Sequence, residues 1–109
     1  MFYKFTAATT HQLAPDCKRR VLAQTDTMML CRLDMDAGHM GPIHSHPHEQ
    51  CTYVISGKVE VVLEDGKSLL EAGDSVGFKS NVPHTYKAVE DSVVLESFTP
   101  LREDIINFG

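Results

Sequence analysis

The sequence predicts an all-β chain, an antiparallel sandwich or barrel, on three observations. About nine short β-prone runs follow one another about every 8 to 12 residues. Glycine, proline, aspartate and asparagine separate most of these runs, as tight turns require. No stretch repeats its apolar residues at the spacing of a long amphipathic helix. Short strands without helices to cover a parallel sheet favour antiparallel pairing.

The chain is expected to open with an arm and two strands. Residues 1–17 carry three aromatic side chains and then a polar run, which predicts a short strand or arm that packs its aromatics, followed by a loop. Residues 19–24 and 28–35 read as strands because their apolar residues suit a pleated surface. Two glycines and a proline in residues 38–42 end the second strand.

A hairpin is expected in the middle of the chain. Residues 51–55 are β-prone and end at Ser56-Gly57, and residues 58–64 then alternate apolar and charged side chains. Asp65-Gly66 follows directly and predicts a type I′ turn, in which both central residues have positive φ. Residues 67–70 form the return strand.

The last third of the chain predicts three more strands. Residues 71–74 are turn-forming, and the short strand 75–78 follows them. Residues 84–88 and 92–98 are the remaining β-prone runs, and a proline ends the second. Residues 101–108 are expected to form a helical turn or an extended tail.

Length and charge limit the functional classes. A chain of 109 residues is expected to be one domain, with its core at about residues 18–99. The formal net charge of −5 argues against nucleic acid as a partner, because phosphate binding requires a basic patch. The short basic cluster Lys18-Arg19-Arg20 is interpreted as a solvated strand edge. No apolar run reaches the length of a signal peptide or a membrane span, so no membrane association is expected.

Cysteine usage predicts a reducing, cytoplasmic environment. Cys17, Cys31 and Cys51 are odd in number and lack the Cys-x-x-Cys spacing of zinc-finger and thioredoxin-like sites. Cys51 lies beside the histidine-rich segment. It is interpreted as a small hydrophobic residue rather than a ligand.

Potential metal ligands alternate in one short segment, at His44, His46, His48 and Gln50. In an extended strand, side chains two residues apart point to one face, so three or four donors would aim at one point. Imidazole and carboxamide oxygen suit several transition metals. The alternative is a solvated histidine-rich loop. Glu49 would point to the opposite face of a regular strand and is not expected to be a ligand.

The same segment resembles the first motif of the cupins, G-x5-H-x-H-x3-4-E-x6-G. Gly38, His44, His46 and Gly57 fill its spacing, and Gln50 stands where the motif has Glu. The resemblance implies a jelly-roll barrel, the cupin double-stranded β-helix, with a short N-terminal arm and a C-terminal tail.

The second cupin motif, G-x5-P-x-G-x2-H-x3-N, matches at Gly73 and His84. Lys79, Asn81 and Ala88 stand at its Pro, Gly and Asn positions. Asn81 suits a turn that needs a left-handed residue. Fifteen residues separate the two motifs, as in compact single-domain cupins.

In cupins the motif residues converge on one metal ion. The resemblance therefore implies that His44, His46, Gln50 and His84 hold one divalent transition metal, such as Ni, Zn, Mn, Fe or Co. Gln in place of Glu removes one negative charge from the ligand set, which would leave the metal a stronger Lewis acid.

The ending LESFTPLRED, residues 95–104, resembles that of small pectin-degradation cupins that linearise 4,5-unsaturated uronates. That likeness implies catalytic roles for Glu96 and Arg102 and a substrate-binding role for Phe98. Glu96 stands where these cupins have Asp, so its carboxylate reaches one methylene further. His48 and Tyr53 are also expected to bind substrate. A structural ion pair between Glu96 and Arg102, with Phe98 in the core, is the alternative.

Three functions remain open. The first is a metal-dependent enzyme that opens or tautomerises a small unsaturated sugar acid, and the second is an Fe(II)-dependent dioxygenase. The third is a non-catalytic module that binds a metal or ligand. The apolar arm and exposed sheet edges predict a homodimer.

Overall fold

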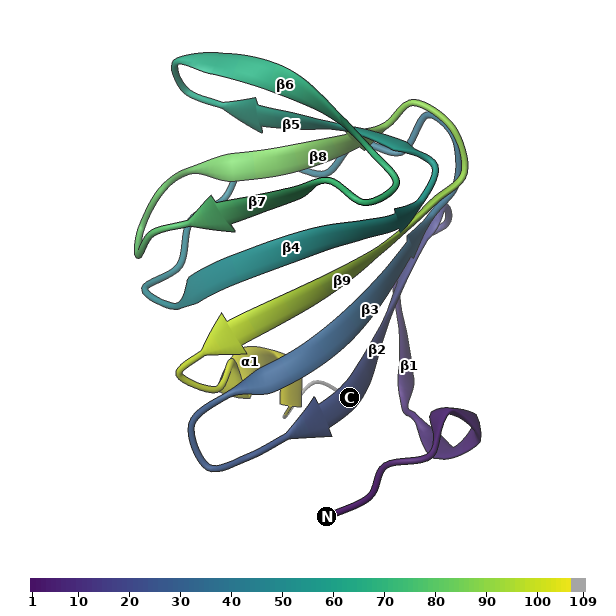
Figure 1. The fold of residues 1–109 in the computed structure, drawn as a ribbon, viewed down its shortest axis with the longest axis vertical. Coiled ribbons are helices and arrows are strands. Elements are labelled where there is room, and N and C mark those ends of the chain that lie inside the picture. Colours follow the sequence, from purple (N-terminus) through teal and green to yellow (C-terminus); the bar gives the residue numbers. More distant parts are fainter. Residues whose placement is uncertain (107–109) are drawn as a thin grey trace.

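A computed structural model of the chain describes residues 1–106, which form nine strands, one 3-10 helix and one short α-helix (Figure 1). The expected all-β class is confirmed. The elements are η1 (Phe5–Ala7), β1 (Thr10–Ala14), β2 (Cys17–Gln24), β3 (Met29–Met35), β4 (Glu49–Ser56), β5 (Lys58–Leu63), β6 (Gly66–Glu71), β7 (Ser75–Phe78), β8 (His84–Ala88), β9 (Ser92–Thr99) and α1 (Glu103–Ile106). Within residues 1–106, no helix is long and apolar enough to span a membrane.

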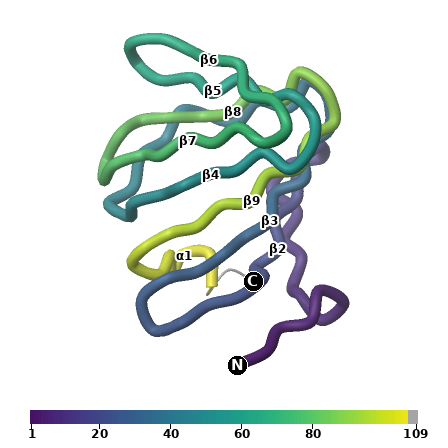
Figure 2. Tube along the Cα trace, viewed as in Figure 1, coloured from purple at the N-terminus to yellow at the C-terminus, as the bar shows by residue number. Residues whose placement is uncertain are grey.

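The strands form two antiparallel sheets, and their order brings distant segments side by side (Figure 2). The larger sheet has the order β1-β2-β3-β9-β4-β7, and the smaller has the order β6-β5-β8. Pairing of β4 with β9 sets Gln50 opposite Phe98 and Thr52 opposite Glu96. All four side chains are buried, so this register concentrates polar groups inside the molecule.

Apolar side chains from both sheets form the main core. Strand β3 buries every second residue, as the pleat of a half-covered strand dictates. The buried members are Cys17, Leu33, Met35, Val54, Val59, Val61, Phe78, Tyr86, Ala88 and Val94. A smaller cluster of Met29, Cys31, Phe98 and Ile105 joins α1 to the larger sheet.

The three cysteines are free thiols. Burial raises the pKa of Cys17 to about 11 and that of Cys31 to about 12, so both thiols are protonated at neutral pH. Cys51 lies on the exposed face of β4, opposite to the face of Gln50. Its side chain therefore points away from the buried polar groups.

Two local expectations are wrong. Residues 44–48 do not extend β4, because the strand begins only at Glu49. The hairpin loop consists of Glu64 and Asp65, since Leu63 pairs with Gly66. Asp65 does not have the positive φ of a type I′ turn, because Asn81 is the single non-glycine residue with positive φ in residues 1–106. At the C-terminus α1 supplies the expected helical turn, and residues 107–108 of that prediction lie outside the described residues.

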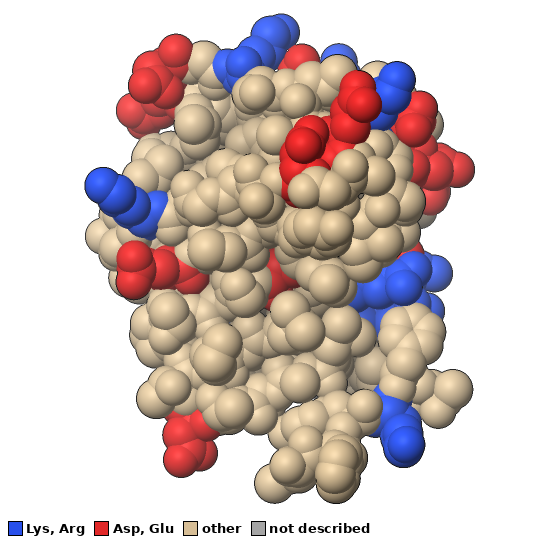
Figure 3. All heavy atoms as spheres, in the orientation of Figure 1, with Lys and Arg blue, Asp and Glu red and all other residues tan. Residues whose placement is uncertain are grey.

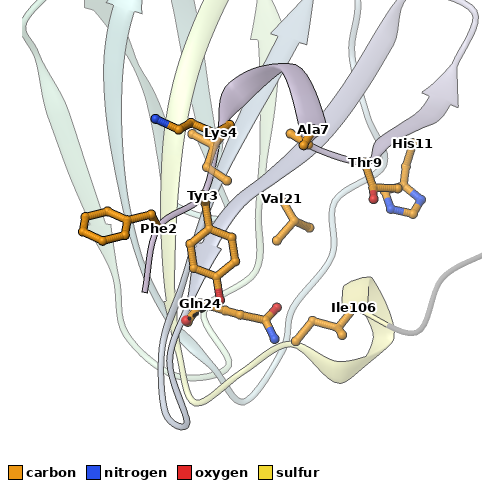
Figure 4. A pocket seen from close by; sticks show the side chains of 11 residues that line it. Phe2, Tyr3, Lys4, Ala7, Thr9, His11, Val21, Gln24 and Ile106 are labelled. Atoms are coloured by element: carbon orange, nitrogen blue, oxygen red, sulfur yellow. Dashed lines mark hydrogen bonds between the residues drawn. The ribbon is translucent and has the colours of Figure 1, made fainter.

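The N-terminal arm is anchored by only some of its aromatic side chains. The Phe5 ring lies under the guanidinium groups of Arg20 and Arg32, and the Tyr3 hydroxyl donates to the Gln24 carbonyl. Phe2 is 96% exposed. A hollow of about 660 Å³ lies between the arm, β2 and Ile106 (Figure 4).

Charged side chains are concentrated near the outline of the face in Figure 3, and uncharged side chains fill most of its middle. Lysine and arginine do not gather there into a continuous basic surface, which agrees with the acidic net charge.

Candidate metal centre

Three histidines from two distant segments meet at one point. One ring nitrogen from each of His44, His46 and His84 lies within 4.8 Å of the others. The backbones of His44 and His84 exchange two hydrogen bonds, of 3.1 and 2.9 Å, in an isolated β-bridge. This bridge, rather than a regular strand through residues 44–50, brings the segments together.

The turn before His84 supports the same arrangement. Asn81 has φ 66°, which confirms the expected left-handed residue at this position. Its backbone N–H donates to the His46 carbonyl at 2.8 Å. The Phe78 ring stacks on the His84 ring with centroids 4.1 Å apart, which holds the imidazole in place.

Backbone carbonyls orient all three imidazole rings. The Nδ1 atoms of His44, His46 and His84 lie 3.1, 2.9 and 2.8 Å from the carbonyl oxygens of residues 42, 48 and 82. A carbonyl can only accept, so Nδ1 carries the proton and Nε2 of each neutral ring has a free lone pair. Histidine ligands to metals are oriented in this way.

The protonation state of the buried rings fits the same role. Burial lowers the pKa of His46 and that of His84, and the positive charge of Arg102 lowers the pKa of His46 further. Both rings are therefore neutral at pH 7. Among residues 1–106, His84 Nε2 is buried without a hydrogen-bond partner. An aimed, unpaired lone pair is what a metal ligand requires.

Gln50 faces this triad from β4. Its Oε1 atom lies 3.0 Å from His46 Nε2, and both atoms are acceptors when the ring is neutral and protonated on Nδ1. Two facing lone pairs repel unless a cation lies between them. The chemistry of the donor set therefore fits a metal ion held by three imidazoles and one amide oxygen.

A set of hydrogen-bonded side chains, here called the inner polar cluster (Gln50, Thr52, Tyr86 and Glu96), fixes the Gln50 amide. Gln50 Nε2 lies 3.0 Å from Thr52 Oγ1, 2.6 Å from the Tyr86 hydroxyl and 3.1 Å from Glu96 Oε2. Since a carboxylate accepts, the amide nitrogen faces Glu96 and the amide oxygen faces His46. Burial and the Glu96 charge raise the pKa of Tyr86 well above its ordinary value, so its hydroxyl stays protonated and donates to Glu96.

Glu96 and Arg102 lie on the wall of one cavity but do not pair with each other. The cavity has a volume of about 230 Å³, and its polar lining includes Arg19, His44, Gln50, Tyr86, Glu96 and Arg102. Arg102 binds Asp104 through Nη2 at 2.6 Å and Nε at 3.3 Å, and this contact lowers the pKa of Asp104. The cation nearest Glu96 is instead Arg19, at 3.7 Å.

None of the remaining expected residues lines this cavity, although Phe98 contacts two groups of the site. Phe98 is 1% exposed, and its ring meets His46 edge-on and lies 5.1 Å from the Arg102 guanidinium. His48 Nε2 is 3.1 Å from the Leu101 carbonyl, and its ring lines a separate hollow near α1. Tyr53 is 47% exposed on the outer face of β4. The structure therefore does not bring His48 or Tyr53 to the cavity.

Sequence reasoning missed Arg19 and Tyr86. Arg19 was expected on a solvated edge, but it shares the inward face of β2 with Cys17 and is 16% exposed. Tyr86 lies two residues after His84 on β8 and is buried. The period of two along each strand is the signal that points to both residues.

Comparisons with known proteins find one matching domain family and several similar proteins. The model of the cupin domain matches residues 31–97. The chain is 32% identical to the pectin degradation protein KdgF of Dickeya dadantii over 97 residues, which cover 87% of this chain and 88% of that protein. The solved structure of KdgF from Halomonas sp. matches with a TM-score of 0.89 and 32% identity, covering 96% of this chain and 99% of that one. An RmlC-like cupin from Shewanella frigidimarina matches with the same TM-score and 27% identity, covering 95% and 94%.

Proposed function

Because the chain belongs to the cupin family, we propose that it is a metal-dependent enzyme that opens the ring of a small unsaturated uronate or a related sugar acid. One observation carries the proposal. Three imidazoles with free lone pairs converge at one point, and one of them, His44, lines the same cavity as the buried carboxylate of Glu96 and two arginines. This set can bind a metal, move a proton and attract an anionic substrate.

His44, His46, His84 and the Gln50 amide oxygen would hold the ion. Imidazole and carboxamide ligands suit Ni, Zn, Mn, Fe or Co. The bound ion would supply Lewis acidity toward a substrate oxygen. A carboxylate ligand would reduce the Lewis acidity of the ion more than the neutral amide of Gln50 does.

Glu96 is proposed to move the proton through Oε1, because Oε2 already accepts from Gln50 and Tyr86. It takes the proton of the anomeric hydroxyl, whose oxygen forms the aldehyde carbonyl as the bond from C1 to the ring oxygen breaks. The ring oxygen keeps that electron pair, takes up a proton and becomes an enol hydroxyl at C5. The enol then loses its proton and gains one at C4, which gives the open-chain keto acid. The reaction is an isomerisation without a net change in oxidation state.

Arg102 is proposed to bind the substrate carboxylate. Two of its nitrogens, Nε and Nη2, donate to Asp104, and these bonds hold the Arg102 side chain in the lining of the cavity. The guanidinium carbon lies 5.1 Å from the centroid of the Phe98 ring, a cation–π contact. The cavity of about 230 Å³ lies below the range of drug-sized ligand pockets and suits a molecule of monosaccharide size.

The uronate class is supported by two similar proteins, the pectin degradation protein KdgF of Dickeya dadantii and KdgF from Halomonas sp.. The test is elemental analysis of the purified protein, followed by incubation with a 4,5-unsaturated uronate. Turnover is followed as loss of the ultraviolet absorption of the conjugated double bond. Metal-loaded protein that leaves this substrate unchanged would refute the proposal.

The Glu96→Gln variant tests the proton transfer. We expect its turnover to fall about 100- to 10,000-fold while the metal content stays unchanged, because general base catalysis contributes a factor of this size. Glu96→Asp, which shortens the side chain by one methylene, serves as the charge-retaining control. Unchanged turnover in Glu96→Gln would remove this carboxylate from the reaction.

A further inference from the structure

The two oxygen atoms of Glu96 have different surroundings. Oε2 accepts hydrogen bonds from the Gln50 amide and the Tyr86 hydroxyl. Oε1 is buried and has no hydrogen-bond partner in the part of the chain that the structure describes. The Glu96 side chain is 3% exposed and lines the cavity, so its Oε1 atom is a buried carboxylate oxygen that can still accept a hydrogen bond there.

Arg19 presents a matching unused donor. Its Nε atom is buried and, among residues 1–106, also lacks a hydrogen-bond partner. The distance from Arg19 Nε to Glu96 Oε1 is 3.7 Å, which is too long for a direct hydrogen bond. Both side chains lie on the wall of the same cavity.

Two other arginines of this chain form closer ion pairs. Arg102 approaches Asp104 to 2.6 Å, and Arg32 approaches Asp34 to 3.0 Å, each through two guanidinium nitrogens. Two more exposed pairs are as long, Arg20 with Asp34 at 3.8 Å and Lys67 with Glu60 at 3.9 Å. Among these pairs, only Arg19 and Glu96 face each other with buried atoms that lack a hydrogen-bond partner, and a missing hydrogen bond costs more there. This contrast indicates that the gap accommodates a third polar group.

We propose that Arg19 and Glu96 together bind one hydroxyl group of the substrate. A hydroxyl oxygen about 2.8 Å from both Arg19 Nε and Glu96 Oε1 would have an angle of about 80° between its two hydrogen bonds. A hydroxyl group accommodates this angle. It would accept from Arg19 Nε–H and donate to Glu96 Oε1. A carboxylate in this gap would meet the Glu96 charge, so the site selects a hydroxyl over an anion.

This inference rests on the proposed function for the identity of the hydroxyl. Oε1 takes the proton in the proposed ring opening, so the hydroxyl in the gap is the anomeric one. As its proton passes to Oε1, the oxygen gains negative charge before the C1–O bond to the ring breaks. The Arg19 N–H then donates to the atom on which charge develops, and this makes Arg19 a catalytic residue.

The test compares two probes that need no turnover, D-galacturonate and its methyl glycoside, which lacks the anomeric hydroxyl proton. Calorimetry is carried out on the metal-loaded wild type, Arg19→Gln and Arg19→Lys. Lys18→Gln is the matched control, because it removes one positive charge from the outward face of the same strand. Metal content and thermal unfolding are measured for each variant. If Arg19→Gln does not fold, Arg19→Lys carries the test, because it keeps the charge and removes Nε.

We expect the wild type and Lys18→Gln to bind galacturonate about 10- to 100-fold more tightly than the glycoside, and both Arg19 variants to lose this preference. With the unsaturated uronate, we expect kcat of the Arg19 variants to fall about 100-fold and KM to change less. Equal binding of the two probes by the wild type, or a preference that survives in the Arg19 variants, would overturn the inference. If the wild type turns over the uronate but binds both probes equally, the proposed function stands and the hydroxyl site at Arg19 and Glu96 is refuted. If the wild type shows an Arg19-dependent preference but no turnover, the hydroxyl site stands and the proposed function is refuted.

Discussion

The substitution Gln50→Glu, which restores the residue of the first cupin motif, is predicted to destabilise the metal-free protein. The Gln50 amide nitrogen is 3.1 Å from Glu96 Oε2, and the new carboxylate oxygen would take its place. Two unit charges at this distance repel by about 5 kcal/mol at an effective dielectric constant of 20. Binding a proton relieves this repulsion, and at pH 7 protonating a carboxyl with an ordinary pKa near 4.3 costs about 4 kcal/mol. The free energy of unfolding should therefore fall by about 4 kcal/mol at pH 7.

The loss should depend on pH in a defined direction. The coupled carboxyl pair in the folded Gln50→Glu protein has a raised apparent pKa, so between pH 4 and 7 the folded state binds more protons than the unfolded state. Stability is then lost as pH rises, and at pH 5 the cost of the proton falls to about 1 kcal/mol. Urea unfolding in the presence of a chelator, at pH 5 and pH 7, measures both values.

The charge-swapped variant Gln50→Glu/Glu96→Gln is the matched control. It contains the same side chains with one carboxylate in the inner polar cluster, so most of the lost stability should return. A Gln50→Glu protein that loses less than about 1 kcal/mol at pH 7, or loses equal amounts at both pH values, would show that the two side chains do not approach as described.

Three further predictions concern other parts of the molecule. Because the pKa values of His46 and His84 are lowered in the folded protein, the unfolded state binds protons at a higher pH, and the metal-free protein should lose stability as pH falls below about 6.5. Thermal unfolding of the metal-free protein over this pH range measures the loss. The double variant His46→Gln/His84→Gln should show a weaker dependence of stability on pH. Gly57→Ala should lower the free energy of unfolding by about 2 to 4 kcal/mol, because φ is 89° and the new Cβ would overlap the start of β9. Gly73→Ala, at φ 95° but with open space around the new Cβ, should lower it by about 1 kcal/mol. Urea unfolding measures both values, and equal losses would contradict a steric cause. Deletion of residues 1–8 should convert the expected homodimer to a monomer in sedimentation, whereas a full-length chain that is monomeric at all concentrations would exclude the dimer.

Much of the fold was predictable because turns and alternation are local properties. Strand bounds agree within about one or two residues for β7, β8 and β9, where glycine, proline or acidic turns flank short β-prone runs. The Asp65-Gly66 turn was misplaced by one residue, because the pairing of β5 with β6, rather than dipeptide preference, sets where the loop lies.

The site was less predictable because burial depends on sheet pairing. Three consecutive charged residues at positions 18–20 indicate a solvated strand, and only the alternation with Cys17, two residues earlier, points to Arg19 as the inward side chain. An ion pair between Glu96 and Arg102 was the alternative to their catalytic roles, but Arg102 binds Asp104, two residues further on in the sequence. An arginine can pair with an acidic residue nearby in the sequence or with one that the fold brings close, and the pairing of the strands determines which of the two is within reach.

The Gln at the position of the motif Glu and the carboxylate at position 96 are linked by one constraint. Gln50 has an acceptor directed at His46 and a donor directed at Glu96, and a neutral amide offers both at once, whereas an ionised carboxylate only accepts. A glutamate at this position would supply the acceptor and repel Glu96. A second carboxylate beside the histidine triad therefore requires the motif Glu to be replaced by a neutral residue that can donate. Variants that remove the charge of Glu96 should therefore tolerate glutamate at position 50, and variants that keep the charge should not.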